Sequence, residues 1–124
     1  MAKKLIVVSH YKSNESIVDT VNMITGFKEI ISINLQEEIS TDYLELSNDD
    51  DYLCLLDIYS EKAINYIQNL FQNFKNYKII TGLNLPMILE AIMCLNTNES
   101  LEDMAFYVSK GARNNIINLK DEVG

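Results

Sequence analysis

The sequence predicts an α/β protein, in which helices cover both faces of a mostly parallel sheet. Short apolar runs alternate with stretches of helical periodicity along all 124 residues. Two of these runs, residues 5–8 and 53–56, are apolar at every position, which is typical of strands buried on both faces. Strands and helices that alternate in this way are joined by right-handed crossovers, and the result is a doubly wound sheet.

Five segments are expected to form the strands of this sheet. They are residues 4–8, 30–34, 52–56, 78–81 and, as a short last strand, 116–119. The strand order 2-1-3-4-5 is common in doubly wound sheets. In that order the first and third strands are neighbours, about 4.8 Å apart.

Helical patterns fill the intervals between these strands. The first helix should end at Gly26, because glycine readily adopts the left-handed conformation that closes a helix. Ser60 and Ser100 are expected to be the N-caps of two later helices. A weaker helix is expected over residues 40–47, and the last helix should end near Gly111.

The composition argues against several classes of function. A net charge of −8 without a basic stripe disfavours binding to nucleic acids or to an anionic membrane surface. No apolar run approaches the ~20 residues of a spanning helix, and the N-terminal run is too short for a signal peptide. Cys54 and Cys94 lie far apart in apolar segments without metal-ligand spacing, which favours buried, reduced thiols. We therefore expect a cytoplasmic protein without a metal or other cofactor.

Polar residues directly follow the predicted strands, at the edge where doubly wound sheets bind ligands. Ser9 and His10 follow the first strand, Asp57 follows the third, and Asn84 lies just beyond the fourth. A lone histidine most often lies on the surface or has its hydrogen bonds satisfied within the fold, and an aspartate after a strand is often a turn residue. Their placement at the ends of adjacent strands is more specific than either residue alone. The sequence therefore predicts that His10, the only histidine, faces Asp57.

Such a pair suits nucleophilic chemistry at the imidazole. A carboxylate that accepts a hydrogen bond from one ring nitrogen fixes the tautomer and leaves the other nitrogen as a nucleophile. The same carboxylate stabilises the positive charge that develops on the ring during attack. Phosphoryl transfer also needs donors for the phosphate oxygens, and the N-terminus of the helix that begins near Ser60 can supply them.

Three segments resemble the enzyme IIA component of the mannose/fructose/sorbose family of the sugar phosphotransferase system. LIVVSH at residues 5–10 is similar to the family's first strand and its phosphorylated histidine. LCLLDIY at residues 53–59 is similar to its third strand, which ends in the aspartate that orients this histidine. TGLNLPMILE at residues 81–90 resembles the T-G-x-N-L-P-M-x-L-E signature, the most specific of the three. The resemblance covers nearly the whole chain.

The resemblance implies that residues 1–124 form one flavodoxin-like phosphocarrier domain. It implies phosphotransferase activity, in which Nε2 of His10 accepts a phosphoryl group from HPr and passes it to an enzyme IIB during sugar uptake. Asp57 would orient His10. It also implies a homodimer that exchanges residues 116–119 between chains. On this interpretation we expect four further residues to contact the phosphate or the partner proteins: Ser9, Tyr11, Ser60 and Asn84.

The sequence departs from the family pattern at two places beside this site. Tyr11 follows the histidine where the family has glycine, and Ser-Glu-Lys-Ala at residues 60–63 replaces a Gly-Gly-Ser-Pro turn. The glycines would let the backbone approach a phosphate closely. Glu61 would repel a phosphoryl group at close range, and Lys62 would compensate.

Other interpretations stay open at this point. A regulatory enzyme IIA-like domain, whose phosphohistidine is sensed by a partner protein rather than driving transport, fits the same residues. A response-regulator receiver would use Asp57 as its acceptor, with Thr81 and Lys120 near its switch positions, but it needs an acidic pair where Ser9 and His10 stand. The phosphotransfer subunit of a dihydroxyacetone kinase shares the histidine chemistry but matches the Asn-Leu-Pro segment less well. The membrane subunits choose the sugar, so this sequence does not reveal it.

Overall fold

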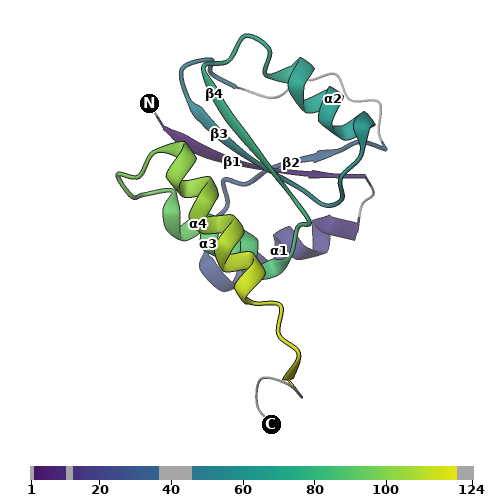
Figure 1. Cartoon of the computed structure of the whole chain (residues 1–124), viewed down its shortest axis with the longest axis vertical. Coiled ribbons are helices and arrows are strands. Elements are labelled where there is room, and N and C mark those ends of the chain that lie inside the picture. Colours follow the sequence, from purple (N-terminus) through teal and green to yellow (C-terminus); the bar gives the residue numbers. More distant parts are fainter. Residues whose placement is uncertain (1, 11–12, 37–45, 120–124) are drawn as a thin grey trace.

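A four-stranded parallel sheet forms the centre of the computed structural model, which describes residues 2–10, 13–36 and 46–119. Its strands are β1 (Lys3–Ser9), β2 (Ile31–Asn34), β3 (Asp51–Leu56) and β4 (Asn76–Thr81). They lie in the order β2-β1-β3-β4 (Figure 1), which confirms the predicted order of the first four strands. β1 and β3, the strands that precede His10 and Asp57, are therefore neighbours.

Helices cover both faces of this sheet. α2 (Glu61–Leu70) lies on one face, and α1 (Ser13–Thr25), α3 (Leu85–Cys94) and α4 (Leu101–Asn114) lie on the other (Figure 1). Because side chains alternate along a strand, β1 contributes to both layers. Leu5 and Val7 pack with α1, α3 and α4, whereas Ile6 and Val8 pack beneath α2. The fully apolar strand is thus explained by burial on its two faces.

The predicted caps fix the ends of the helices. The side chain of Ser60 accepts a hydrogen bond from the Ala63 N–H at 3.1 Å and begins α2. The side chain of Ser100 accepts one from the Asp103 N–H at 3.1 Å and begins α4. Gly26 follows α1 with a φ of 73°, a conformation that glycine adopts without strain. The weaker helix expected over residues 40–47 lies largely outside the described residues.

α4 does not end near Gly111, as the sequence suggested, but continues to Asn114. A single glycine costs a helix only about 1 kcal/mol, and the buried neighbours Val108 and Ala112 hold this turn against the core. Gly111 instead allows a close approach between two helices. A Cβ atom at this position would lie 3.3 Å from the Cγ of Glu90 on α3.

We expect Gly111→Ala to stabilise the protein less in the wild-type background than in a Glu90→Ala background. Alanine favours a helix over glycine by about 1 kcal/mol, but here its Cβ meets the Glu90 side chain. The two gains in the free energy of unfolding should differ by about 0.5–1 kcal/mol, measured by urea denaturation of the four variants. Equal gains in both backgrounds would mean that Glu90 does not restrict this position.

Residues 116–119, predicted as a fifth strand, form no strand in the structure. They follow α4 and lead away from the sheet (Figure 1), and Ile116 and Leu119 are 76% and 68% exposed. A strand exists only through hydrogen bonds to a neighbouring strand, and among the described residues this segment belongs to no sheet. Among the described residues, β4 therefore has one unpaired edge.

Both cysteines are free and buried, as predicted. Burial in an apolar environment raises the pKa of the Cys54 thiol to about 12, so this thiol stays protonated and unreactive at neutral pH. Within the described ranges, no helix combines the length and the apolar character needed to cross a bilayer. The same ranges hold no cluster of three or more side chains suited to a metal ion.

Candidate functional site

His10 and Asp57 meet at the carboxyl edge of the sheet, where the sequence placed them. His10 follows β1 directly and Asp57 follows β3 directly. The Asp57 N–H donates to the carbonyl oxygen of Val8 at 3.1 Å and extends the pairing of the two strands beyond their last residues. The two side chains are therefore positioned by backbone that belongs to the rigid sheet.

The Asp57 carboxylate accepts three hydrogen bonds, and two of them come from His10. Its Oδ1 lies 2.7 Å from Nδ1 of the His10 ring and accepts from the Ile58 N–H at 2.8 Å. Its Oδ2 accepts from the backbone N–H of His10 at 2.9 Å. A carboxylate can only accept, so Nδ1 carries the ring proton and Nε2 carries the lone pair of the neutral imidazole.

Ser60 completes the site from the start of α2. Its Oγ lies 2.7 Å from Nε2 of His10, and the same Oγ accepts the Ala63 N–H. With the ring proton on Nδ1, Nε2 can only accept, so the Ser60 hydroxyl donates its proton to this ring nitrogen. The imidazole is therefore held at both nitrogens, by an acceptor at Nδ1 and by a donor at Nε2.

The site is partly enclosed and partly exposed to solvent. The side chains of His10 and Asp57 are each 20% exposed. Ile58 and Tyr59, which lie between Asp57 and Ser60 in the chain, are 58% and 68% exposed. Large apolar side chains that remain exposed around a reactive group are common where another protein docks.

The other predicted site residues are not joined to His10 by any hydrogen bond among the described residues. Ser9 is buried, and its hydroxyl donates to the carbonyl oxygen of Ile33 at 3.5 Å. The side chain of Asn84 caps α3 and accepts the Met87 N–H at 2.9 Å. Tyr11 lies outside the described residues. The role of these three residues toward a phosphate or a partner stays a prediction.

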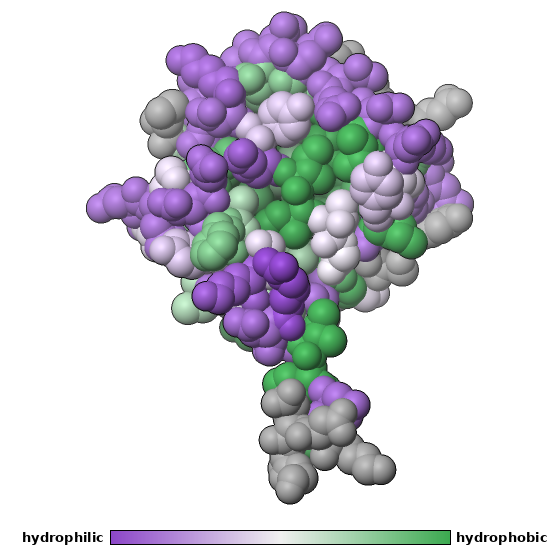
Figure 2. All heavy atoms as spheres, viewed as in Figure 1, coloured by the Kyte–Doolittle hydropathy of each residue, from purple (hydrophilic) through white to green (hydrophobic). Residues whose placement is uncertain are grey.

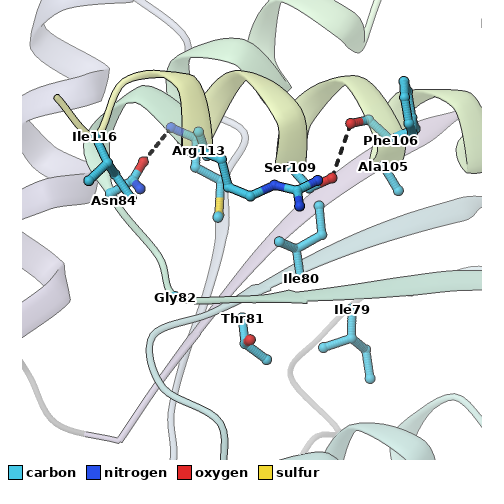
Figure 3. A pocket seen from close by; sticks show the side chains of 12 residues that line it. Ile79, Ile80, Thr81, Gly82, Asn84, Ala105, Phe106, Ser109, Arg113 and Ile116 are labelled. Atoms are coloured by element: carbon cyan, nitrogen blue, oxygen red, sulfur yellow. Dashed lines mark hydrogen bonds between the residues drawn. The ribbon is translucent and has the colours of Figure 1, made fainter. Parts of the chain in front are cut away.

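A groove of about 590 Å³, which no sequence pattern indicated, lies between β4 and α4. Ile80 of β4 faces α4 across this groove, and Arg113 extends along its rim (Figure 3). Hydrophobic side chains gather at the centre of the same face of the molecule (Figure 2). The apolar lining of the groove comes mainly from β4, α4 and the segment after α4. It consists of Ile79, Ile80, Met87, Ala105, Phe106, Ala112 and Ile116.

Fold and site together define a flavodoxin-like α/β domain with a carboxylate-held histidine at the carboxyl edge of its sheet. Solved structures of similar fold include a phosphotransferase-system permease from Klebsiella pneumoniae, with a TM-score of 0.81 and 18% identity, which covers 100% of this chain and 96% of that one. Another is the mannose/sorbose-specific IIA subunit from Enterococcus faecalis, with a TM-score of 0.74 and 21% identity over 95% of each chain.

The family model described as the fructose IIA component of the phosphotransferase system (EIIA-man) matches residues 4–108. The chain belongs to this family and hence to the components of the sugar phosphotransferase system. A curated relative, the mannose-specific EIIAB component of Escherichia coli K12, is 20% identical over 130 residues. That alignment covers 97% of this chain but only 40% of the relative, so the chain spans about two fifths of its length.

Proposed function

We propose that this chain is a phosphocarrier, whose His10 accepts a phosphoryl group from HPr and passes it to an enzyme IIB during sugar uptake. The observation that carries the proposal is the 2.7 Å contact between Nδ1 of His10 and Oδ1 of Asp57 at a partly exposed edge of the sheet. A ring held in this way is oriented for attack and reachable by a protein donor. The chain would act in the cytoplasm, with residues 1–124 as the working domain.

The transfer requires no proton to move. The Nε2 lone pair of His10 forms the new N–P bond while the N–P bond of the donor phosphohistidine breaks, and the donor nitrogen keeps that electron pair. The proton on Nδ1 stays in its hydrogen bond to Asp57, whose charge stabilises the ring as it becomes positive. Transfer to the acceptor is the same step in reverse.

The first turn of α2 is the part of the site that would bind the phosphate oxygens. A helix N-terminus presents backbone N–H groups and a partial positive charge to an anion, and Ser60 brings this terminus to Nε2 of His10. Glu61 and Lys62 follow in the same turn, and both are solvent-exposed. Their charges would therefore act on a phosphate or a partner from the surface, where salt screens them.

A reconstituted relay tests this proposal. The protein is incubated with enzyme I, HPr and labelled phosphoenolpyruvate, and the label is expected to be acid-labile and alkali-stable, as phosphohistidine is. An enzyme IIB from the same genome is then added and should remove the label. Failure to acquire label from phosphorylated HPr would contradict the proposal.

The alternative is a regulatory domain whose phosphohistidine is sensed rather than passed on. It is favoured by the Ser-Glu-Lys-Ala sequence at residues 60–63, because this turn adjoins His10 and differs from the family pattern. The second step of the same experiment separates the two functions. A label that is acquired from HPr but retained in the presence of every enzyme IIB of the genome would favour the regulatory role.

We infer in addition that two chains associate through the groove beside β4. The unpaired edge of β4 and the exposed apolar residues Ile116, Ile117 and Leu119 support this inference, because a strand from a second chain would bury both. Exchange of a terminal segment between identical chains is a common route to a dimer. Residues 116–119 would then form the predicted strand, supplied by the partner chain.

The expected result is that Ile80→Asp or Ile117→Asp shifts the protein from dimer to monomer in sedimentation velocity. Both substitutions place a charge in the apolar contact, where it would be buried on association. Met23→Asp is the matched control, because Met23 lies on α1 and is 85% exposed. A wild-type protein that sediments as a 14.2 kDa monomer at all concentrations would contradict the inference.

A further inference from the structure

We propose that the Ser60 hydroxyl blocks Nε2, the nucleophilic atom of His10, so that His10 reacts only after the Ser60 side chain has turned away. We call this displaceable hydroxyl the plug. The inference rests on the proposed function and adds a form of control to the same site. It follows from the two contacts of a single oxygen atom. Ser60 Oγ lies 2.7 Å from Nε2 of His10 and accepts the Ala63 N–H at 3.1 Å.

The first contact occupies the electron pair that performs the reaction. The lone pair of Nε2 lies in the plane of the ring, and the Ser60 hydroxyl donates its proton to it. A phosphorus atom must approach along this same direction for attack in line with the leaving group. The hydroxyl oxygen and the phosphorus atom therefore compete for one position.

The other contacts of His10 determine whether the imidazole or the Ser60 side chain moves. Rotation of the imidazole would break the Nδ1 contact to Asp57 as well as the contact to Ser60. Rotation of Ser60 about its Cα–Cβ bond leaves the ring and Asp57 in place. Ser60 is therefore the side chain that moves, while His10 keeps the orientation that transfer requires.

The movement also exposes a binding group for the incoming phosphate. When Oγ leaves, the Ala63 N–H loses its acceptor in the first turn of α2. A phosphoryl oxygen can accept that N–H in place of the hydroxyl. The phosphoryl group thus replaces both contacts of the Ser60 oxygen, one at Nε2 and one at the helix. A donor too small to supply other contacts must displace the plug unaided.

Potassium phosphoramidate, a small phosphoryl donor, tests this directly. The Nε2 lone pair forms an N–P bond and the P–N bond of the reagent breaks. The nitrogen of the reagent, protonated as –NH3⁺ in its zwitterion, keeps the electron pair of that bond and leaves as ammonia. Ser60→Gly removes the hydroxyl, yet glycine remains a tolerated N-cap. We expect the label to form about 2- to 10-fold faster on this variant, since a net hydrogen bond of ordinary strength is lost from the resting state. The ¹⁵N resonance of Nε2 should also move toward that of an imidazole nitrogen without a donor.

Ser100→Gly is the matched control, because Ser100 caps α4 through the same type of contact and touches no part of the site. Its rate with phosphoramidate should equal that of the wild type. A Ser60→Gly rate equal to or below the wild-type rate would overturn the plug while leaving the phosphocarrier intact. No label on His10 of wild type or variant, from phosphoramidate or from HPr, would overturn the proposed function together with the plug.

Discussion

His10→Ala is expected to abolish phosphorylation of the protein by HPr, with no acid-labile, alkali-stable label above background. The chain has no second histidine to take over the role. The imidazole supplies the nitrogen nucleophile of the site, and Asp57 and Ser60 hold it at both ring nitrogens. Quantification of the label after quenching, with and without acid treatment, measures the effect.

His10→Gln is the matching conservative variant, because its amide can fill part of the same space. It should also remain unlabelled, and circular dichroism should report a folded protein in both cases. Alkali-stable label on either variant would place the phosphoryl group on another residue and refute the assignment of His10. Label that is stable in acid but labile in alkali would likewise place the phosphoryl group on a residue other than His10.

Asp57→Asn is expected to slow phosphoryl transfer from HPr by about 10²- to 10³-fold, because one preorganised charge is removed from the transition state. Asparagine can keep one acceptor oxygen, but its NH₂ group would face either the His10 backbone N–H or the ring Nδ1. In the first orientation the His10 backbone N–H loses its acceptor, and in the second the ring loses the acceptor that fixes its tautomer. Rapid-quench measurement of a single turnover gives the rate.

Asp50→Asn provides the control for this substitution. Asp50 is also a paired carboxylate, with Oδ2 3.0 Å from the Lys4 ammonium and Oδ1 accepting the Ala2 N–H at 3.1 Å. It lies just before β3, at the amino ends of the strands, whereas His10 lies at their carboxyl ends. Both variants should lose some thermal stability, but only Asp57→Asn should lose rate. A rate for Asp57→Asn within about threefold of the wild type would exclude the role given to this carboxylate.

The strand order and the His10–Asp57 contact could be predicted because they follow from topology. Once two buried strands are neighbours in a parallel sheet, the residues that follow them must lie at the same edge. The contact between Ser60 and Nε2 could not be predicted in this way. The sequence identified Ser60 as a helix cap, but no residue pattern indicated that the chain after Asp57, where the Ile58 N–H donates to the Asp57 carboxylate, would bring Ser60 back to the ring.

The two differences between expectation and structure at the C-terminal end have different physical origins. Gly111 looked like a helix stop because glycine is a poor helix former, but the packing of α3 against α4 outweighs that preference. Residues 116–119 have a strand-like composition, yet in the part of one chain that the structure describes no strand pairs with them. Propensity describes a residue by itself, whereas both outcomes depend on what lies beside it.

The carboxylate of Asp57 accepts hydrogen bonds from both the backbone N–H and the ring of His10. A free histidine side chain samples several rotamers, and freezing one of them costs entropy, of order 1 kcal/mol for a side chain. In this protein the freezing occurs during folding, before any donor arrives. On the proposed function, each encounter with a donor would therefore begin with Nε2 of His10 already oriented, and the ring would not have to reorient between docking and transfer.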